Sequence, residues 1–216
     1  MTEHNIFQEI QEDLERQKLE ALWGRYGPLV IAAAIAIVIG TAGITAWHSW
    51  RIDKNQQATA ELMAALKPAA GDDTKQIDAL QLFAKKNQGA TQAVLAELHA
   101  AALAAQNGKQ DQAVQIYDTI AKDNNADPAF RQLADLLSVR TQLDTGNTEE
   151  LQKRLQVLQG DKAPWHFTAM EYSGYLALRA GDKEKAKKIF ADLSQDAGVP
   201  QSLSTRAADM LRYVSE

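Results

Sequence analysis

Hydrophobic residues near the start of the chain recur at intervals of three and four. In "NIFQEIQEDLERQKLEALW" the apolar positions Ile6, Phe7, Ile10 and Leu14 share one side of a helix, which predicts an amphipathic helix within residues 1–27. Such a helix could lie on a membrane surface or a partner protein, or could be a solvated lead-in. Its acidic polar side argues against anionic lipid, because membrane-surface helices usually carry Lys and Arg there.

The next stretch, "RYGPLVIAAAIAIVIGTAGITAWHSWR", has no charged residue between its two arginines. Residues 29–47 are 19 uncharged positions, and as a helix they cover about 28 Å, close to the thickness of a bilayer core. Aromatic and basic residues that suit the headgroup region flank the stretch on both sides: Trp23, Arg25, Tyr26, Trp47, Trp50 and Arg51. This pattern predicts one retained transmembrane helix over residues 28–50.

Two other interpretations of this stretch are a core helix of a soluble protein and a cleaved signal peptide. Core helices are usually shorter and rarely have aromatic residues at both ends. Residues 1–25 contain six Asp/Glu and three Lys/Arg, whereas the region before a signal sequence is short and basic. Three Lys/Arg residues precede the helix and two, Arg51 and Lys54, follow it closely. This small difference favours a cytoplasmic N-terminus, with residues 51–216 translocated.

The remaining residues read as one helix after another with a recurring short segment. "NGKQDQA", "TGNTEEL" and "AGDKEKA" place Gly108, Gly146 and Gly181 at spacings of 38 and 35 residues. Periods of this length are typical of stacked helical hairpins. A glycine would end one helix in a left-handed turn, and a polar residue would cap the next. Ordinary helical-bundle packing remains an alternative.

The segments on either side of these repeats complete the predicted array. "QATAELMAAL" and "TKQIDALQLFAKK" indicate a less regular hairpin with its turn at residues 71–73, and "PQSLSTRAADMLRYV" indicates a final capping helix. Pro128 and Pro164 are expected to open the helices that follow them. The predicted fold is therefore all-α, with a single transmembrane helix followed by an α-solenoid.

The hairpins resemble the tetratricopeptide repeat, which is built of two antiparallel helices. Small and aromatic residues stand where that family has them: Ala101, Ala113, Tyr117, Gly174, Ala186 and Phe190. The repeats are degenerate, because the family's first-helix Trp and some of its small residues are replaced. These departures are Glu97, Met170, Ile120, Leu193 and Leu151.

Composition and charge narrow the possible functions. The net charge of −5 gives no support for nucleic-acid binding, and the absence of cysteine excludes disulfides and thiol chemistry. The four histidines are far apart in sequence, and no nucleophile-elbow, Walker or dinucleotide motif occurs. We therefore expect no catalytic residues, no metal, no cofactor and no small-molecule substrate. The rival class, an envelope enzyme or small-ligand binder, would need a deep polar pocket.

Protein binding is the better prediction, because stacked hairpins present their first helices on a concave surface. In the expected register Leu98, Ala102 and Leu136 contribute to that surface. The residues expected to contact a partner are His99, Arg140, Glu171, Tyr172, Tyr175 and Arg179. The alternative for the two tyrosines is packing between helices.

The whole layout, including the "LWGRYGP" entry to the apolar stretch, resembles the YfgM-like ancillary subunits of the SecYEG translocon. Membership would imply a bacterial inner-membrane protein with a cytoplasmic N-terminus and a periplasmic repeat domain. It would also imply association with the SecYEG translocon, with periplasmic chaperones or foldases of the PpiD type, and with emerging exported chains. The resulting hypothesis is a non-enzymatic, membrane-tethered scaffold. The alternative is an adaptor for envelope assembly or cell division.

Overall fold

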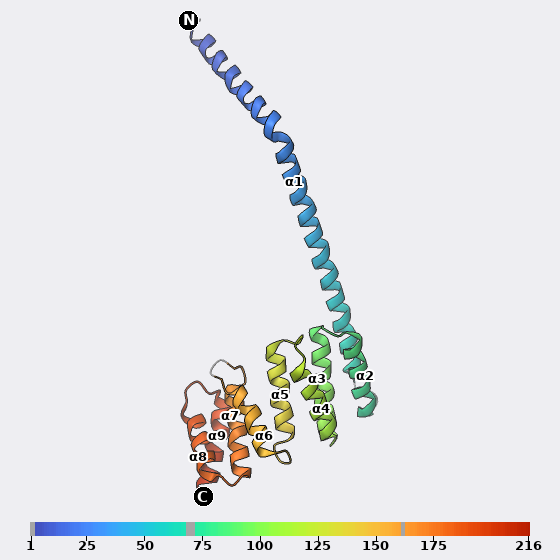
Figure 1. Cartoon of the computed structure of the whole chain (residues 1–216), viewed down its shortest axis with the longest axis vertical. Helices are drawn as coiled ribbons and strands as arrows, with labels where there is room; N and C mark the ends of the chain where they lie inside the picture. Colours follow the sequence, from blue (N-terminus) through green and yellow to red (C-terminus); the bar gives the residue numbers. More distant parts are fainter. Residues whose placement is uncertain (1–2, 68–71, 161–162) are drawn as a thin grey trace. The chain divides into compact units, whose positions relative to one another are not determined.

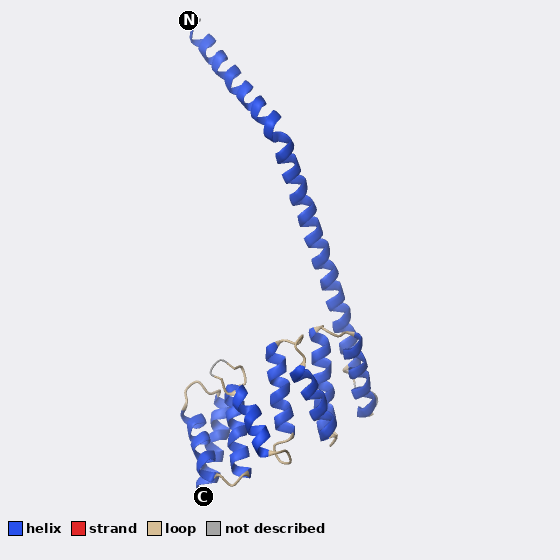
Figure 2. Cartoon of the chain, in the orientation of Figure 1, coloured by secondary structure: helices blue, strands red, loops and turns tan. Residues whose placement is uncertain are grey.

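The structure is a computed structural model of the chain. It describes the backbone of residues 3–67, 72–160 and 163–216, and the side chains of these residues except 3–23, 25, 27, 28 and 30–36. Within these ranges the chain forms nine helices and no strand (Figures 1 and 2), which confirms the all-α prediction. The chain divides into two units, Met1–Gln57 and Ala58–Glu216.

Most of the first helix, α1 (Glu3–Ala65), makes up the first unit. The helix runs without a break through both the predicted amphipathic segment and the uncharged stretch. Thr41 Oγ1 donates to the carbonyl of Ile37 at 2.9 Å, and Thr45 Oγ1 donates to the carbonyl of Thr41 at 2.8 Å. These hydroxyls therefore satisfy their hydrogen bonds within the helix itself. Over the described residues, no helix combines the length and apolar character required to cross a membrane.

The second unit contains the end of α1 and eight further helices. These are α2 (Asp73–Lys86), α3 (Thr91–Gln106), α4 (Gln110–Lys122), α5 (Pro128–Thr141), α6 (Thr148–Leu158), α7 (His166–Arg179), α8 (Lys183–Gln195) and α9 (Gln201–Ser215). From α2 onward each helix packs against the next in sequence, and α3 also contacts α5 as α7 contacts α9. The pairs α3–α4, α5–α6 and α7–α8 are the three predicted hairpins, and α9 packs on α8 as the expected final helix.

Three apolar clusters follow one another along the second unit. The first joins the end of α1 to α2, α3, α4 and the start of α5. The second joins α5, α6 and α7, and the third joins α7, α8 and α9. Because α5 and α7 each contribute to two clusters, every hairpin is stabilised by its neighbours, as expected for a repeat array.

Two of the three repeat glycines end a helix in the predicted way. Gly108 and Gly181 have φ of 72° and 79°, a conformation that costs glycine little and other residues more. The N–H groups of Lys109 and Asp182, which follow them, each bond a carbonyl five residues back, at 2.9 Å. Asp182 also caps α8 by accepting a hydrogen bond from the Lys185 N–H at 3.0 Å.

Gly146 differs from the other two repeat glycines, because it lacks a positive φ. A Cβ at this position would lie 2.9 Å from Gln142 Cβ and 3.0 Å from Leu151 Cδ1. The middle repeat therefore requires glycine because the α5–α6 turn packs closely on α6, and the expected left-handed turn is wrong here.

Candidate protein-interaction surface

The structure distributes the six predicted partner-contacting residues over the first helices of the three hairpins. His99 on α3 and Arg140 on α5 are exposed, while Tyr172, Tyr175 and Arg179 on α7 are partly buried. Glu171 is only 2% exposed, and the neighbouring predicted residue Leu136 is also buried. His99 and Arg140 are therefore the exposed residues of this set, while Tyr172, Tyr175 and Arg179 are only partly accessible.

Glu171 is engaged inside the fold by an arginine from the capping helix. Arg206 Nε and Nη2 donate to the two carboxylate oxygens of Glu171 at 2.8 and 2.9 Å. Tyr175 Oη donates to Glu171 Oε1 at 3.1 Å. Burial, followed by the charge of Glu171, raises the pKa of Tyr175 to about 12, so its hydroxyl remains protonated and acts as a donor. The carboxylate is thus fully used within the protein.

Arg179, the last residue of α7, fastens the turn between α5 and α6. Its guanidinium donates to the backbone carbonyls of Leu143 and Gly146 and to the hydroxyl of Thr148. This side chain, more than 30 residues away in sequence, therefore holds the turn through its backbone carbonyls. This arrangement gives Arg179 a clear structural role, and its contact with a partner remains a prediction.

A groove of about 300 Å³ is lined by residues of α3, α4 and α5. We call it the first-helix groove, and its lining residues are Ala102, Ala105, Gln106, Gln110, Tyr117, Leu137, Arg140 and Thr141. Arg140 is the one charged residue among them. Burial raises the pKa of Tyr117, and the nearby positive charge of Arg140 opposes that shift.

Tyr172 on α7 is electrostatically coupled to Arg140 of the first-helix groove. Burial raises the pKa of Tyr172, and the charge of Arg140 again acts in the opposite direction. Arg140 is therefore close enough to interact electrostatically with phenols from the hairpins on both sides of its own. The ring of Tyr172 lies 6.5 Å from that of Tyr175. Arg140 is therefore near the partly buried Tyr172 of the following hairpin and near Tyr117 of the preceding one, which is only 3% exposed.

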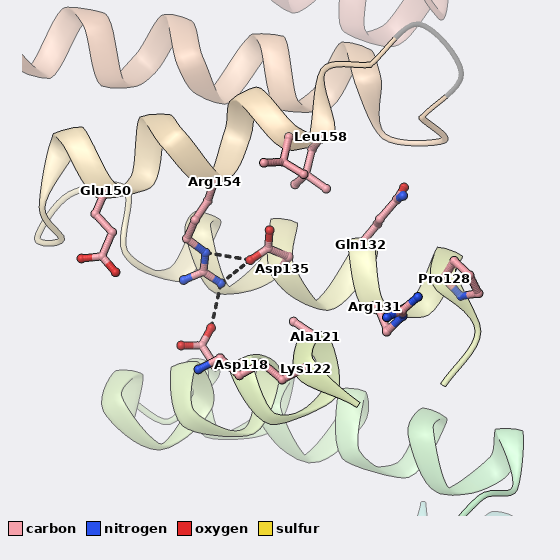
Figure 3. A pocket seen from close by; sticks show the side chains of 11 residues that line it. Asp118, Ala121, Lys122, Pro128, Arg131, Gln132, Asp135, Glu150, Arg154 and Leu158 are labelled. Carbon is pink, nitrogen blue, oxygen red and sulfur yellow. Dashed lines mark hydrogen bonds and ion pairs between the residues drawn. The ribbon is translucent and has the colours of Figure 1, made fainter. Parts of the chain in front are cut away.

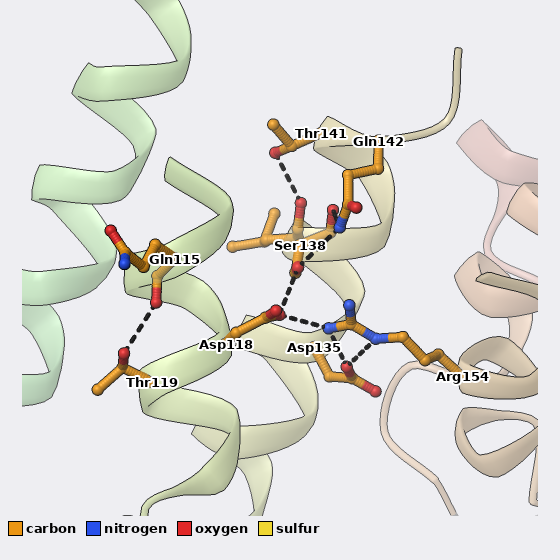
Figure 4. Close-up of polar contacts among 9 residues, drawn as sticks. Gln115, Asp118, Thr119, Asp135, Ser138, Thr141, Gln142 and Arg154 are labelled. Carbon is orange, nitrogen blue, oxygen red and sulfur yellow. Dashed lines mark hydrogen bonds and ion pairs between the residues drawn. The ribbon is translucent and has the colours of Figure 1, made fainter. Parts of the chain in front are cut away.

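A second groove, of about 510 Å³, lies between α4, α5 and α6 (Figure 3). Arg154 lines this groove and forms ion pairs with both Asp118 and Asp135. The Arg154 Nη2 atom lies 2.7 Å from Asp118 Oδ1. Ser138 Oγ also donates to Asp118 Oδ1 at 2.6 Å (Figure 4). One guanidinium is shared by two carboxylates from two hairpins, so the network links α4, α5 and α6 inside the protein.

The predicted membrane-interface residues belong to the first unit. Tyr26, Trp47, Trp50 and Arg51 are exposed, whereas the side chains of Trp23 and Arg25 lie outside the described residues. The guanidinium carbon of Arg51 is 5.9 Å from the Trp47 ring centroid. Lys54 Nζ is 4.3 Å from the Trp50 ring centroid, within the range of a cation–π interaction.

Two arginines of this region are not identifiable as contact residues from the sequence, and the place of Tyr117 in the groove is also not predicted. Arg206 and Arg154 are ordinary surface arginines by sequence, and only the packing of distant helices brings carboxylates to them. Tyr117 was identified as a packing residue at the aromatic repeat position. Tyr117 occupies the aromatic position of the second repeat helix, and this position could have been used to predict that it lines the groove. Among the described residues no group of three or more His, Asp or Glu gathers as a metal site.

Comparison with known proteins places this architecture in a family. Residues 20–207 match the family described as the tetratricopeptide repeat-like domain. The chain is 28% identical over 191 residues to a protein of Aggregatibacter actinomycetemcomitans named "Ancillary SecYEG translocon subunit", and the match covers 88% of this chain and 91% of that protein. No solved structure matches the chain significantly. The resemblance seen in the sequence is confirmed, and the chain belongs to the tetratricopeptide repeat-like domain family.

Proposed function

We propose that this protein is a non-enzymatic, membrane-tethered interaction scaffold that acts as an ancillary subunit of the SecYEG translocon. The observation that carries the proposal is the likeness to the protein named "Ancillary SecYEG translocon subunit", which extends over 88% of this chain. A tetratricopeptide-like array supports a protein-interaction role, because stacked hairpins offer an extended surface to a partner.

In this proposal residues 28–50 anchor the chain in the bacterial inner membrane as a single pass. The support is the 19-residue uncharged stretch at positions 29–47, its aromatic and basic flanks, and threonine hydroxyls bonded to the helix backbone. The N-terminal residues 1–27 are then cytoplasmic, and the repeat domain that follows the anchor is periplasmic.

The repeat domain binds its partners through the first-helix surface around His99, Arg140 and Tyr172. Tyr175, Glu171 and Arg179 support that surface through the contacts described above. The partners we propose are the translocon, periplasmic chaperones or foldases of the PpiD type, and emerging exported chains. A membrane tether raises the local concentration of such partners near the translocon without any catalytic group.

Topology can be tested by cysteine labelling, because the chain contains no native cysteine. Two variants, Thr2→Cys and Ser215→Cys, are treated in intact spheroplasts with a membrane-impermeant maleimide. We expect labelling at position 215 alone, and labelling at position 2 only after the membrane is permeabilised. Labelling of position 2 in intact spheroplasts, with position 215 protected, would refute the proposed orientation.

Association can be tested by mild-detergent purification of the full chain from membranes at its natural expression level. We expect translocon subunits to co-purify, and a variant lacking residues 28–50 to lose them. Recovery of envelope-assembly or cell-division proteins in place of translocon subunits would support the adaptor alternative and contradict the proposal.

A further inference from the structure

We propose that the first-helix groove binds an acidic side chain of an extended polypeptide segment, with Arg140 as the residue that selects it. The inference rests on the proposed function in assuming that the repeat domain binds polypeptides. It goes beyond that function in specifying which chemical feature of the bound segment is recognised, and where.

The side chain of Arg140 differs from the other arginines that join hairpins. Arg154, Arg179 and Arg206 each bind oxygen atoms of a neighbouring helix or turn. For Arg140, no ion pair or side-chain hydrogen bond is present among the described residues. The residue is exposed, and none of the groove's lining residues is acidic. The groove therefore contains one positive charge without a matching negative charge.

The surroundings of Arg140 favour a carboxylate as its ligand. Tyr117 lines the groove but is only 3% exposed, so the exposed guanidinium of Arg140 is the main polar group that the groove offers to a ligand. A guanidinium can bind the two oxygens of a carboxylate together. Beside it, Ala102 and Leu137 provide apolar surface for the methylene groups that carry the carboxylate.

The ligand is a side chain within a segment, and not the end of one, because the surface continues on both sides of Arg140. His99 lies on the preceding first helix and Tyr172 on the following one. An extended chain that contacts all three hairpins has its backbone on both sides of the groove. The residue that meets Arg140 is then internal to that segment.

The test uses the full-length protein in detergent and fluorescein-labelled, amidated peptides of the pattern SGALAXALAGS, where X is Glu, Gln or Lys. Fluorescence anisotropy gives the Kd of each. We expect the Glu peptide to bind about tenfold more tightly than the Gln peptide, because a charge-assisted hydrogen bond is worth roughly that factor. Arg140→Gln should remove the difference, and Arg140→Glu should make the Lys peptide the preferred ligand.

Arg212→Gln is the matched control, since Arg212 is exposed on α9 and pairs with Asp209, three residues earlier in the same helix. It should retain the preference for Glu, and thermal unfolding should confirm that all variants are folded. Equal binding of the Glu and Gln peptides by the natural protein would overturn this inference and leave the proposed function standing. A Gln peptide with a free C-terminal carboxylate that binds as tightly as the amidated Glu peptide would also overturn it. If translocon subunits do not co-purify with the natural protein, that result contradicts the proposed function and does not bear on the groove.

Discussion

The ring of Phe190 on α8 packs directly against Gly174 on α7. A Cβ atom at position 174 would lie 2.7 Å from Phe190 Cζ and 2.9 Å from Cε1, closer than carbon atoms normally approach. Phe190 is fully buried. The two helices of this hairpin therefore come together through one position without a side chain and one large ring.

Gly174→Ala should destabilise the repeat domain in spite of the better helix propensity of alanine. Alanine gains about 1 kcal/mol over glycine within a helix, but overpacking a filled core costs about 1–3 kcal/mol. We expect a net loss of about 1 kcal/mol, measured as a Tm lowered by about 2–4 °C. Gly160→Ala is the control, because a Cβ there meets no atom within 4 Å. A higher Tm for Gly174→Ala would show that Phe190 moves aside easily.

Removing the arginine that pairs with Glu171 should leave a buried carboxylate without its counter-charge. Arg206→Met should lower the free energy of unfolding by about 2 kcal/mol, less than for a fully buried pair because water reaches the guanidinium. In a Glu171→Gln background the same substitution should cost much less, because no charge remains to be neutralised. Urea unfolding of the four proteins gives this coupling. Equal costs in both backgrounds would mean that the ion pair adds nothing to stability.

The link made by Arg154 should depend on charge as well as on packing. Arg154→Met leaves the carboxylates of Asp118 and Asp135 without their shared counter-charge. We expect the free energy of unfolding, measured with urea at low salt, to fall by about 2 kcal/mol. Added sodium chloride should recover part of that loss, because it screens the repulsion between the two carboxylates. The neighbouring exposed residue supplies the control variant, Lys153→Ala. A loss that is unchanged by salt would indicate that packing of the Arg154 stem dominates.

Glu97 should make the stability of the repeat domain depend on pH. Burial, followed by the negative charge of Asp123, raises the pKa of Glu97 above its ordinary value of 4.5. The folded state then holds this proton at pH values where the unfolded state has lost it, so stability falls as the pH rises from about 4.5.

Glu97→Gln should therefore be more stable than the natural protein at pH 7, and the two should become equal near pH 4. The effect is small because Glu97 is only half-buried, and thermal unfolding across this pH range should resolve it. Glu149→Gln, on the exposed side of α6, is the control. A Glu97→Gln advantage that persists unchanged at pH 4 would exclude ionisation as its cause.

The local features of the fold could be predicted from the sequence because local physics determines them. The spacing of small and aromatic residues predicted that Gly174 and Phe190 belong to one hairpin, and the structure brings them into contact. Gly108 and Gly181 were predicted to end helices, and both do so. The reason why glycine is required at position 146 could not be predicted, because the Leu151 side chain approaches this position only in the folded turn.

The polar contacts of the candidate site were harder to predict for the same reason. Glu171 was expected on the surface, but Arg206 binds it from 35 residues away in sequence. No periodicity in either helix indicates that pairing. The helical register predicted Leu136 and Arg140 on the same surface, and the structure exposes Arg140 but buries Leu136.

The most direct test of the central claim is photo-crosslinking in living cells from the first-helix surface. A photoreactive residue replaces His99 on α3, and the control replaces Lys188, which is exposed on the second helix of the last hairpin. We expect adducts with translocon subunits, periplasmic chaperones or exported chains from position 99, and few from position 188. Adducts from position 99 with cytosolic proteins, or translocon adducts from position 188 alone, would contradict it.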